Sequence, residues 1–238
     1  MSNLRIAVLD SGVNPSHPHV GGLTAGVDVA GEVSSEDTVD RLGHGTAVAA
    51  LIHALAPEAT IVPVRIFDKT LSTNLPTLLR ALEWCAANSI QIINLSLGTT
   101  NENHREPFEQ AVTHIADAGA MLVAPYAMEK TLLLPGTLPG VVGVVADADC
   151  ADTVCTVKQV ASKAVFGAQP YPRDIPGVPR SSNLRGVSFS VARVSAYLAR
   201  IWSSQKARDP LDESLFFGVD QAGIGLRSRP SKRNIAGA

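Results

Sequence analysis

Residues 4–13 read Leu-Arg-Ile-Ala-Val-Leu-Asp-Ser-Gly-Val, and this stretch decides the fold. Its apolar residues predict a strand over 4–9 that is buried on both faces, as strands of parallel sheets are. The strand ends at Asp10, and Ser11-Gly12 is typical of a tight turn. Open α/β sheets carry their ligand groups at the carboxyl ends of such strands. The segment therefore predicts a parallel sheet with Asp10 at its functional edge.

Apolar runs and segments of helical period alternate along the rest of the chain. The predicted strands cover residues 60–66, 90–97, 121–124 and 141–146, and the predicted helices cover residues 46–55, 75–88, 106–119 and 188–202. Pro63 removes a hydrogen-bond donor from one strand, so we expect one-sided pairing or local irregularity there. Residues 166–185 are dense in proline, glycine and serine and predict a loop. The alternation predicts an α/β fold of three layers, with helices on both faces of a mostly parallel twisted sheet.

Length and charge limit the organisation and the partners. The 238 residues favour one domain over residues 1–203, followed by a peripheral C-terminal extension over 204–238. A net charge of −2 gives no reason to expect nucleic acid or an anionic membrane as a partner. The basic residues between 227 and 233 are interpreted as a solvated tail. Since the sequence has neither a signal-peptide core nor a membrane-length apolar run, we expect a cytoplasmic protein.

The three cysteines are too few, and odd in number, for a disulfide framework. Cys85, Cys150 and Cys155 are therefore expected to be reduced thiols, in keeping with a cytoplasmic protein. A local disulfide between Cys150 and Cys155, or half of a metal site, remains an alternative. Three aspartates between residues 147 and 152 leave a calcium site open, but their spacing is not that of a dedicated site. We expect no metal and no cofactor.

Three segments carry side chains suited to nucleophilic catalysis. They are Asp10-Ser11-Gly12, Gly43-His44-Gly45-Thr46 and Ser188, which opens a predicted helix. Taken singly, each has a structural explanation as a turn, a loop or a helix cap. Together they supply a nucleophile, a base within reach of it and an acid that fixes the tautomer of the base. The order Asp, His, Ser along the chain is that of subtilisin, for which this order is well known.

The segments around these residues resemble the motifs of the subtilase family. Residues 6–13 look like its aspartate motif, and residues 43–50 resemble its histidine motif, with Ala47 in place of a second histidine. Residues 93–98 are similar to the strand that lines the substrate groove, and residues 186–192 resemble the serine motif in a degraded form. The resemblance spans roughly residues 4 to 200.

The resemblance implies a role for each matched residue. Ser188 is the expected nucleophile, His44 the general base and Asp10 the group that orients His44. Ser96, Leu97 and Gly98 are expected to pair through their backbone with an extended peptide substrate.

Two departures from the family concern the surroundings of Ser188. Val187 stands where the family has threonine, and an apolar residue near Met128 stands where the family has its oxyanion asparagine. Loss of such a donor lowers the rate about a hundred- to a thousandfold in subtilisin. Asn183 is a conceivable substitute donor, although a surface turn residue is the simpler interpretation.

The resemblance implies a serine endopeptidase that acts through an acyl-enzyme. Compact cytoplasmic subtilases include maturation proteases, so a ribosomally made precursor peptide is a candidate substrate. Two alternatives remain open at this point: a catalytically weak pseudo-protease that binds peptides in the groove, and a peptide acyl transferase that uses the same triad.

Overall fold

The computed structural model describes residues 4–31, 35–160 and 163–208, with side chains as far as residue 203. Met1–Arg200 form one compact unit. Most of the predicted C-terminal extension, with the basic residues between 227 and 233, lies outside the described residues. The boundary after residue 203 therefore stays a prediction.

Within the described residues, eight strands form one sheet in the order β2-β3-β1-β4-β5-β8-β10-β9. The strands are β1 Arg5–Asp10, β2 Val27–Asp28, β3 Thr60–Arg65, β4 Ile92–Leu95, β5 Met121–Pro125, β8 Val141–Ala146, β9 Thr156–Val160 and β10 Lys163–Ala168. Neighbouring strands are parallel except β9 and β10, which are antiparallel. A separate short hairpin joins β6 (Ala127–Met128) to β7 (Thr131–Leu132).

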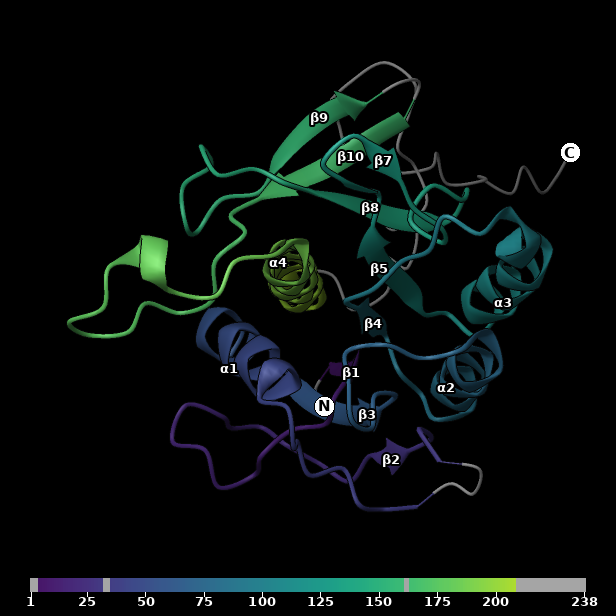
Figure 1. The fold of residues 1–238 in the computed structure, drawn as a ribbon, viewed down its shortest axis with the longest axis horizontal. Coiled ribbons are helices and arrows are strands. Elements are labelled where there is room, and N and C mark those ends of the chain that lie inside the picture. The colour runs from purple at the N-terminus through teal and green to yellow at the C-terminus, as the bar shows by residue number, and fades with distance from the viewer. Residues whose placement is uncertain (1–3, 32–34, 161–162, 209–238) are drawn as a thin grey trace, which may run out of the picture. The chain divides into compact units, whose positions relative to one another are not determined.

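The long helices cover the two faces of this sheet. They are α1 His44–Leu55, α2 Leu75–Ala87, α3 Arg105–Asp117 and α4 Val187–Arg208. Figure 1 shows α1 and α4 on one face and α2 and α3 on the other. The predicted three-layer α/β fold is therefore confirmed.

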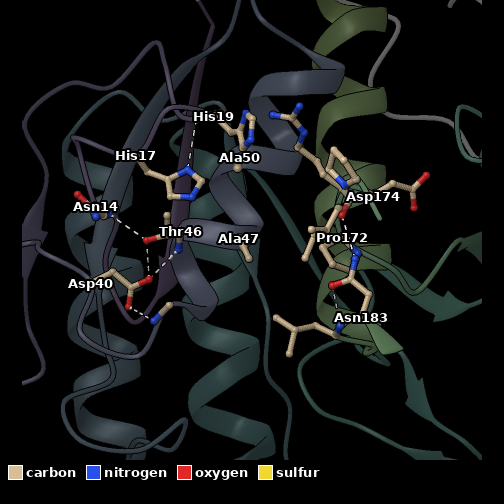
Figure 2. A pocket seen from close by; sticks show the side chains of 15 residues that line it. Asn14, His17, His19, Asp40, Thr46, Ala47, Ala50, Pro172, Asp174 and Asn183 are labelled. Atoms are coloured by element: carbon tan, nitrogen blue, oxygen red, sulfur yellow. Dashed lines mark hydrogen bonds between the residues drawn. The ribbon is translucent and has the colours of Figure 1, made fainter. Parts of the chain in front are cut away.

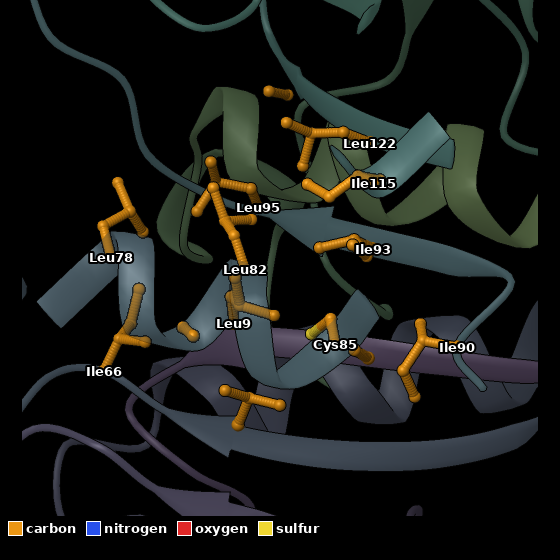
Figure 3. Close-up of a cluster of buried hydrophobic side chains, with 14 of the residues drawn as sticks. Leu9, Ile66, Leu78, Leu82, Cys85, Ile90, Ile93, Leu95, Ile115 and Leu122 are labelled. Atoms are coloured by element: carbon orange, nitrogen blue, oxygen red, sulfur yellow. The ribbon is translucent and has the colours of Figure 1, made fainter. Parts of the chain in front are cut away.

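A large apolar core fills the space between the sheet and the helix pair α2 and α3. Figure 3 shows Leu9, Ile93 and Leu122 from the strands meeting Leu82 of α2 and Ile115 of α3. All five side chains are at most 2% exposed. Each such side chain contributes about 1.5–3 kcal/mol through burial, so this face anchors the sheet on which the site is built.

The ends of the predicted elements lie within two residues of those observed, except that α4 ends at Arg208 and not at the predicted residue 202. In α2, the side chain of Asn74 accepts a hydrogen bond from the backbone N–H of Thr77 at 2.9 Å and caps the helix start. Pro63 pairs with Val8 of β1, whereas β2 joins β3 only from Val64 onward. The predicted one-sided pairing at Pro63 is confirmed.

The predicted loop over 166–185 is wrong at its start, because residues 166–168 belong to β10. Strand β9 was not predicted either. Its sequence Thr-Val-Lys-Gln-Val is partly polar, and its residues alternate between exposed and half-buried at the sheet edge. Such a strand is held by its antiparallel partner β10, which a local apolar pattern does not reveal.

All three cysteines are free thiols, so the alternative of a local disulfide is wrong. The described residues hold no group of three or more His, Cys, Asp or Glu side chains placed to bind a metal ion. Among the aspartates between 147 and 152, Asp147 pairs with Lys158 at 2.8 Å and Asp152 pairs with Arg180 at 2.7 Å. No helix in the described part of the chain is long and apolar enough to cross a membrane.

Candidate active site

Strand β1 delivers Asp10 to the edge of the sheet, where its side chain is fully buried. One carboxylate oxygen, Oδ1, lies 2.7 Å from Nδ1 of His44 and accepts the backbone N–H of Ser11 at 2.8 Å. A carboxylate only accepts, so Nδ1 of His44 carries the proton in this pair. The other ring nitrogen, Nε2, is then left to act as a base.

The start of α1 is held in place by polar contacts around His44. The carboxylate of Asp40 accepts the backbone N–H groups of Leu42, Gly43 and Thr46 at 2.8–2.9 Å and the hydroxyl of Thr46 at 2.6 Å. These contacts satisfy donors that a helix start leaves free. Burial alone would raise the pKa of Asp40, but the hydrogen bonds from Thr46 and Leu42 outweigh it and the pKa is lowered.

The residue after His44 is glycine for a steric reason. A Cβ at this position would lie 2.2 Å from the carbonyl oxygen of Gly12 and 3.1 Å from Cβ of Asp10. Its backbone N–H also donates to the hydroxyl of Ser11 at 2.9 Å. Only glycine allows α1 to approach β1 this closely, and the close approach brings His44 to Asp10.

The pKa of His44 is raised above its ordinary value. Burial of the ring opposes protonation, but the hydrogen bond and negative charge of Asp10 outweigh it, with a further contribution from the charge of Asp40. A histidine stabilised in its charged form accepts a proton more readily. The site therefore contains an oriented imidazole suited to general-base chemistry.

Ser188 lies in the first turn of α4, on the other side of the site. Its Oγ donates to the backbone carbonyl of Ser96 at 3.3 Å. The ring of the next residue, Phe189, lies 5.7 Å from the ring of His44, centroid to centroid. Among the described residues no hydrogen bond joins Ser188 to His44. The structure thus brings the start of α4 beside His44, while the serine hydroxyl points to Ser96.

A chain of hydrogen bonds ties α4 to the end of β4. Ser195 of α4 donates to the side-chain oxygen of Asn94 at 3.0 Å, and the amide of Asn94 donates to Oγ of Ser96 at 3.1 Å. Gly98 lies at the far end of the predicted substrate segment. A Cβ there would come within 2.8 Å of Leu133. The substrate-binding role of Ser96, Leu97 and Gly98 stays a prediction.

Neither candidate for an oxyanion side chain is arranged as a donor. Met128 lies in β6 with 59% of its surface exposed and has no hydrogen-bonding group of use. The amide nitrogen of Asn183 donates to the backbone carbonyl of Arg173 at 3.0 Å, and its oxygen accepts the N–H of Leu184. Asn183 is thus a turn residue of its own loop, in agreement with the simpler interpretation.

Three residues of the site were missed in the sequence. Ser11 and Asp40 support the start of α1, and Phe189 lies against the imidazole. Asp40 had a detectable signal, because an acidic residue shortly before a helix start is a typical capping group. No sequence signal marked Phe189 as a site residue, since an aromatic residue in an amphipathic helix is normally expected to belong to the hydrophobic core.

Known proteins match the chain over most of its length. The sequence model of the subtilase family matches residues 1–163. The chain is 29% identical over 229 residues to the minor extracellular protease Epr of Bacillus subtilis (strain 168), covering 90% of this chain and 33% of that protein. It is 32% identical over 224 residues to a thermostable alkaline protease of Halalkalibacterium halodurans, covering 87% and 57%. The chain thus spans between a third and three fifths of the length of these relatives.

Solved structures show the same fold. The structure of the prenylagaramide maturation protease PagA is 26% identical and superposes with a TM-score of 0.65, covering 86% of this chain and 77% of that one. A lanthipeptide protease superposes with a TM-score of 0.66 at 18% identity, covering 87% and 75%. The second likeness concerns the fold alone.

Proposed function

Since the chain belongs to the subtilase family, we propose that it is a serine endopeptidase with Asp10, His44 and Ser188 as its catalytic triad. The observation that carries this proposal is the 2.7 Å contact between Nδ1 of His44 and Oδ1 of Asp10, made beside the first turn of α4. The pair fixes the tautomer of the imidazole and supports its charged form, as peptide-bond hydrolysis by a serine requires.

The reaction proceeds in two steps. Oγ of Ser188 attacks the scissile carbonyl carbon while its proton passes to Nε2 of His44. The C–N bond then breaks, the amine leaves with that proton, and the acyl group stays on Ser188 as an ester. A water molecule gives its proton to His44 and attacks the ester, which releases the acid and returns the proton to Ser188. Asp10 stabilises the imidazolium in both steps.

The resting hydrogen bond of Ser188 has a role in this sequence. Its hydroxyl donates to the carbonyl of Ser96, which is also the group that an added substrate strand would use as an acceptor. A backbone N–H of the substrate would compete for this carbonyl. Rotation of the serine about χ1 then turns the hydroxyl toward His44. Substrate binding thus aligns the nucleophile with its base.

Charge on the forming oxyanion is stabilised mainly by the backbone. The N–H of Ser188 lies in the first turn of α4, where such groups have no partner inside the helix. The positive end of the helix dipole adds to this effect. With Met128 in place of an amide donor, the site lacks a second contribution, so we expect slow turnover.

A precursor peptide is the substrate we favour. Two proteins that share the fold are a lanthipeptide protease and a prenylagaramide maturation protease. A slow enzyme suits a substrate that is cut once and is held by contacts outside the scissile bond. The three free cysteines support a reducing, cytoplasmic location.

Labelling with a serine-directed phosphonate, followed by mass mapping of the modified peptide, tests the proposal. We expect modification at Ser188 and none in Ser188→Ala. The competing function is a pseudo-protease that binds peptides without cutting them, and it is favoured by the apolar Met128. Absence of label on Ser188, together with retained peptide binding, would establish that second function instead.

A further inference from the structure

A cavity of about 370 Å³ lies between α1 and the loop that precedes α4. Ala47 and Ala50 of α1 form one wall, and Pro172, Ile175 and Leu184 form the apolar part of the other. Figure 2 shows Ala47 and Ala50 facing Pro172 and Asn183 across the cavity. Ile175 and Leu184 are 50% and 56% exposed, so this wall of the cavity presents two large apolar side chains close together in the loop. The cavity thus presents apolar surface in the described part of the chain.

The sequence of α1 explains the free volume. Gly43, Ala47 and Ala50 follow one another at helical spacing and all line the cavity. Ala47 occupies the position where the subtilase histidine motif has its second histidine. An imidazole at residue 47 would project from the same helix face into this space. The substitution by alanine therefore leaves room for a side chain from another molecule.

Among the described residues that line the cavity, one cation at the rim has no partner. The Asp40 carboxylate is engaged by donors of the α1 start, and Asp174 pairs with Arg180 at 2.8 Å. Within the described part of the chain, the half-buried side chain of Arg173 has neither an ion pair nor a hydrogen bond. Across the cavity, the rings of His17 and His19 lie 5.5 Å apart. Within the described lining, Arg173 is therefore the group that can pair with a carboxylate of a bound peptide.

The cavity also has a definite place beside the triad. Gly43 precedes His44 directly, and Leu184 lies four residues before Ser188. The contact between Ser188 and Ser96 is made on the β4 side of the α4 start. Figure 1 shows the loop before α4 on the opposite side of that start from β4. If the acyl half of a substrate lies along Ser96–Gly98, the cavity lies on the side of the leaving amine.

We propose that this cavity binds an apolar side chain of the substrate on the leaving-group side of the scissile bond, with an adjacent acidic residue paired to Arg173. This assignment rests on the proposed peptidase function for the direction of the peptide. The binding itself needs only the cavity and the charge of Arg173. Burial of one apolar side chain gives about 10- to 100-fold in affinity or in kcat/KM.

Binding is measured first on the Ser188→Ala protein, so that it does not depend on turnover. The immobilised protein is mixed with short peptides of otherwise random sequence that carry Leu-Glu, Ser-Glu, Leu-Gln or Ser-Gln at their centre. The bound fraction is read by mass spectrometry. We expect peptides with Leu-Glu to be retained about tenfold or more over those with Ser-Gln, and the other two sets to lie between them.

Two further variants locate the effect. In the Ser188→Ala protein, Ala47→His restores the histidine of the family motif and should remove the preference for leucine. Arg173→Gln in the same protein should remove only the preference for glutamate. The proposal is overturned if the four peptide sets bind equally, or if Ala47→His leaves the leucine preference unchanged. Because Arg173→Gln changes a half-buried loop side chain, its result stands even if the α1 variant is unstable.

Turnover separates this inference from the proposed function. In the protein with Ser188 intact, we expect cleavage on the N-terminal side of the Leu-Glu pair, and Ala47→His should lower kcat/KM for Leu-Glu peptides to about the value for Ser-Glu peptides. Selective binding without labelling or cleavage would sink the peptidase proposal and keep the cavity assignment. Cleavage without any preference for Leu-Glu peptides would overturn the cavity assignment and support the peptidase proposal.

Discussion

The starts of α1 and α4 carry the two halves of the site, and they are built differently. His44 at the start of α1 is fixed by Asp10, and its backbone surroundings by Ser11 and Asp40. Among the described residues, the hydroxyl of Ser188 at the start of α4 makes one hydrogen bond, at 3.3 Å, to the backbone carbonyl of Ser96 and none to His44. In the proposed triad, the base is thus held in place before substrate arrives, whereas the hydroxyl of Ser188 is not yet bonded to it.

For the proposed reaction, this difference predicts which substitutions change the rate most. A preorganised base and acid lower the barrier without any rearrangement at the moment of reaction. A nucleophile that first has to turn adds a step that depends on the substrate. The comparison therefore predicts large losses when the Asp10–His44–Ser188 set is changed, and gains when the surroundings of Ser188 are improved.

Replacement of Ser188 by alanine gives the largest expected effect. Loss of the nucleophile removes the acyl-enzyme route, and kcat should fall about 10⁴-fold or more. Peptide hydrolysis followed by mass spectrometry measures it. Ser182→Ala, at an exposed serine in the turn Arg180–Ser182, is the matched control and should keep full activity. Equal activity of both variants would remove Ser188 from the mechanism.

Asp10→Asn is expected to lower kcat about 10³- to 10⁴-fold. The amide can present its N–H group to Nδ1 of His44, which then stabilises the wrong tautomer and no longer supports the imidazolium. Kinetics across pH give the measurement, and circular dichroism checks the fold of this buried position. A loss below tenfold in a folded variant would argue against the general-base role of His44.

Met128→Asn should raise kcat, since the resemblance to the family puts its oxyanion asparagine near residue 128. Such a donor contributes up to about a hundred- to a thousandfold, and an imperfect fit should still give about tenfold. Glu129→Asn, at the next residue of the same hairpin, is the control and should leave kcat unchanged. If both variants behave alike, residue 128 does not face the oxyanion.

Asp40→Ala is expected to lower the free energy of unfolding by about 1–2 kcal/mol, through loss of the acceptor for the α1 start. The pKa of Asp40 is lowered in the folded protein, so its contribution is present at neutral pH and is lost as the pH falls below the ordinary aspartate value. Urea unfolding at two pH values measures both effects. Asp37→Ala, which breaks an exposed pair with Arg41, is the control and should change the free energy of unfolding far less, since solvent screens such a pair.

The pH profile gives the smallest effect and the finest test of the comparison. The base must be neutral to accept a proton, and the pKa of His44 is raised. The fall of kcat/KM on the acid side should therefore occur above the ordinary pKa of histidine, 6.5. In Asp10→Asn the fall should move to lower pH, because the group that raises the pKa is gone. A flat profile would contradict the assignment.

The sequence predicted the elements that have strong local signals. The buried strands at 4–9 and 141–146 and the long amphipathic helices were placed within a few residues, because apolar period and burial agree there. Strand β9 was missed because its polar edge sequence is ordered by pairing with β10. The contact of Asp10 with His44 follows from their motifs, while the orientation of Ser188 toward Ser96 does not.

Three features can be read from the amino-acid sequence alone: the sheet-forming pattern, the order of Asp10, His44 and Ser188, and alanine at position 47 in place of the family's second histidine. How segments far apart in the chain meet depends on the tertiary packing. The support of Ser96 by Ser195 through Asn94, and the cavity between α1 and the loop before α4, arise this way. Local patterns report whether a residue is buried, whereas a hydrogen-bond direction or a cavity depends on which surfaces pack together.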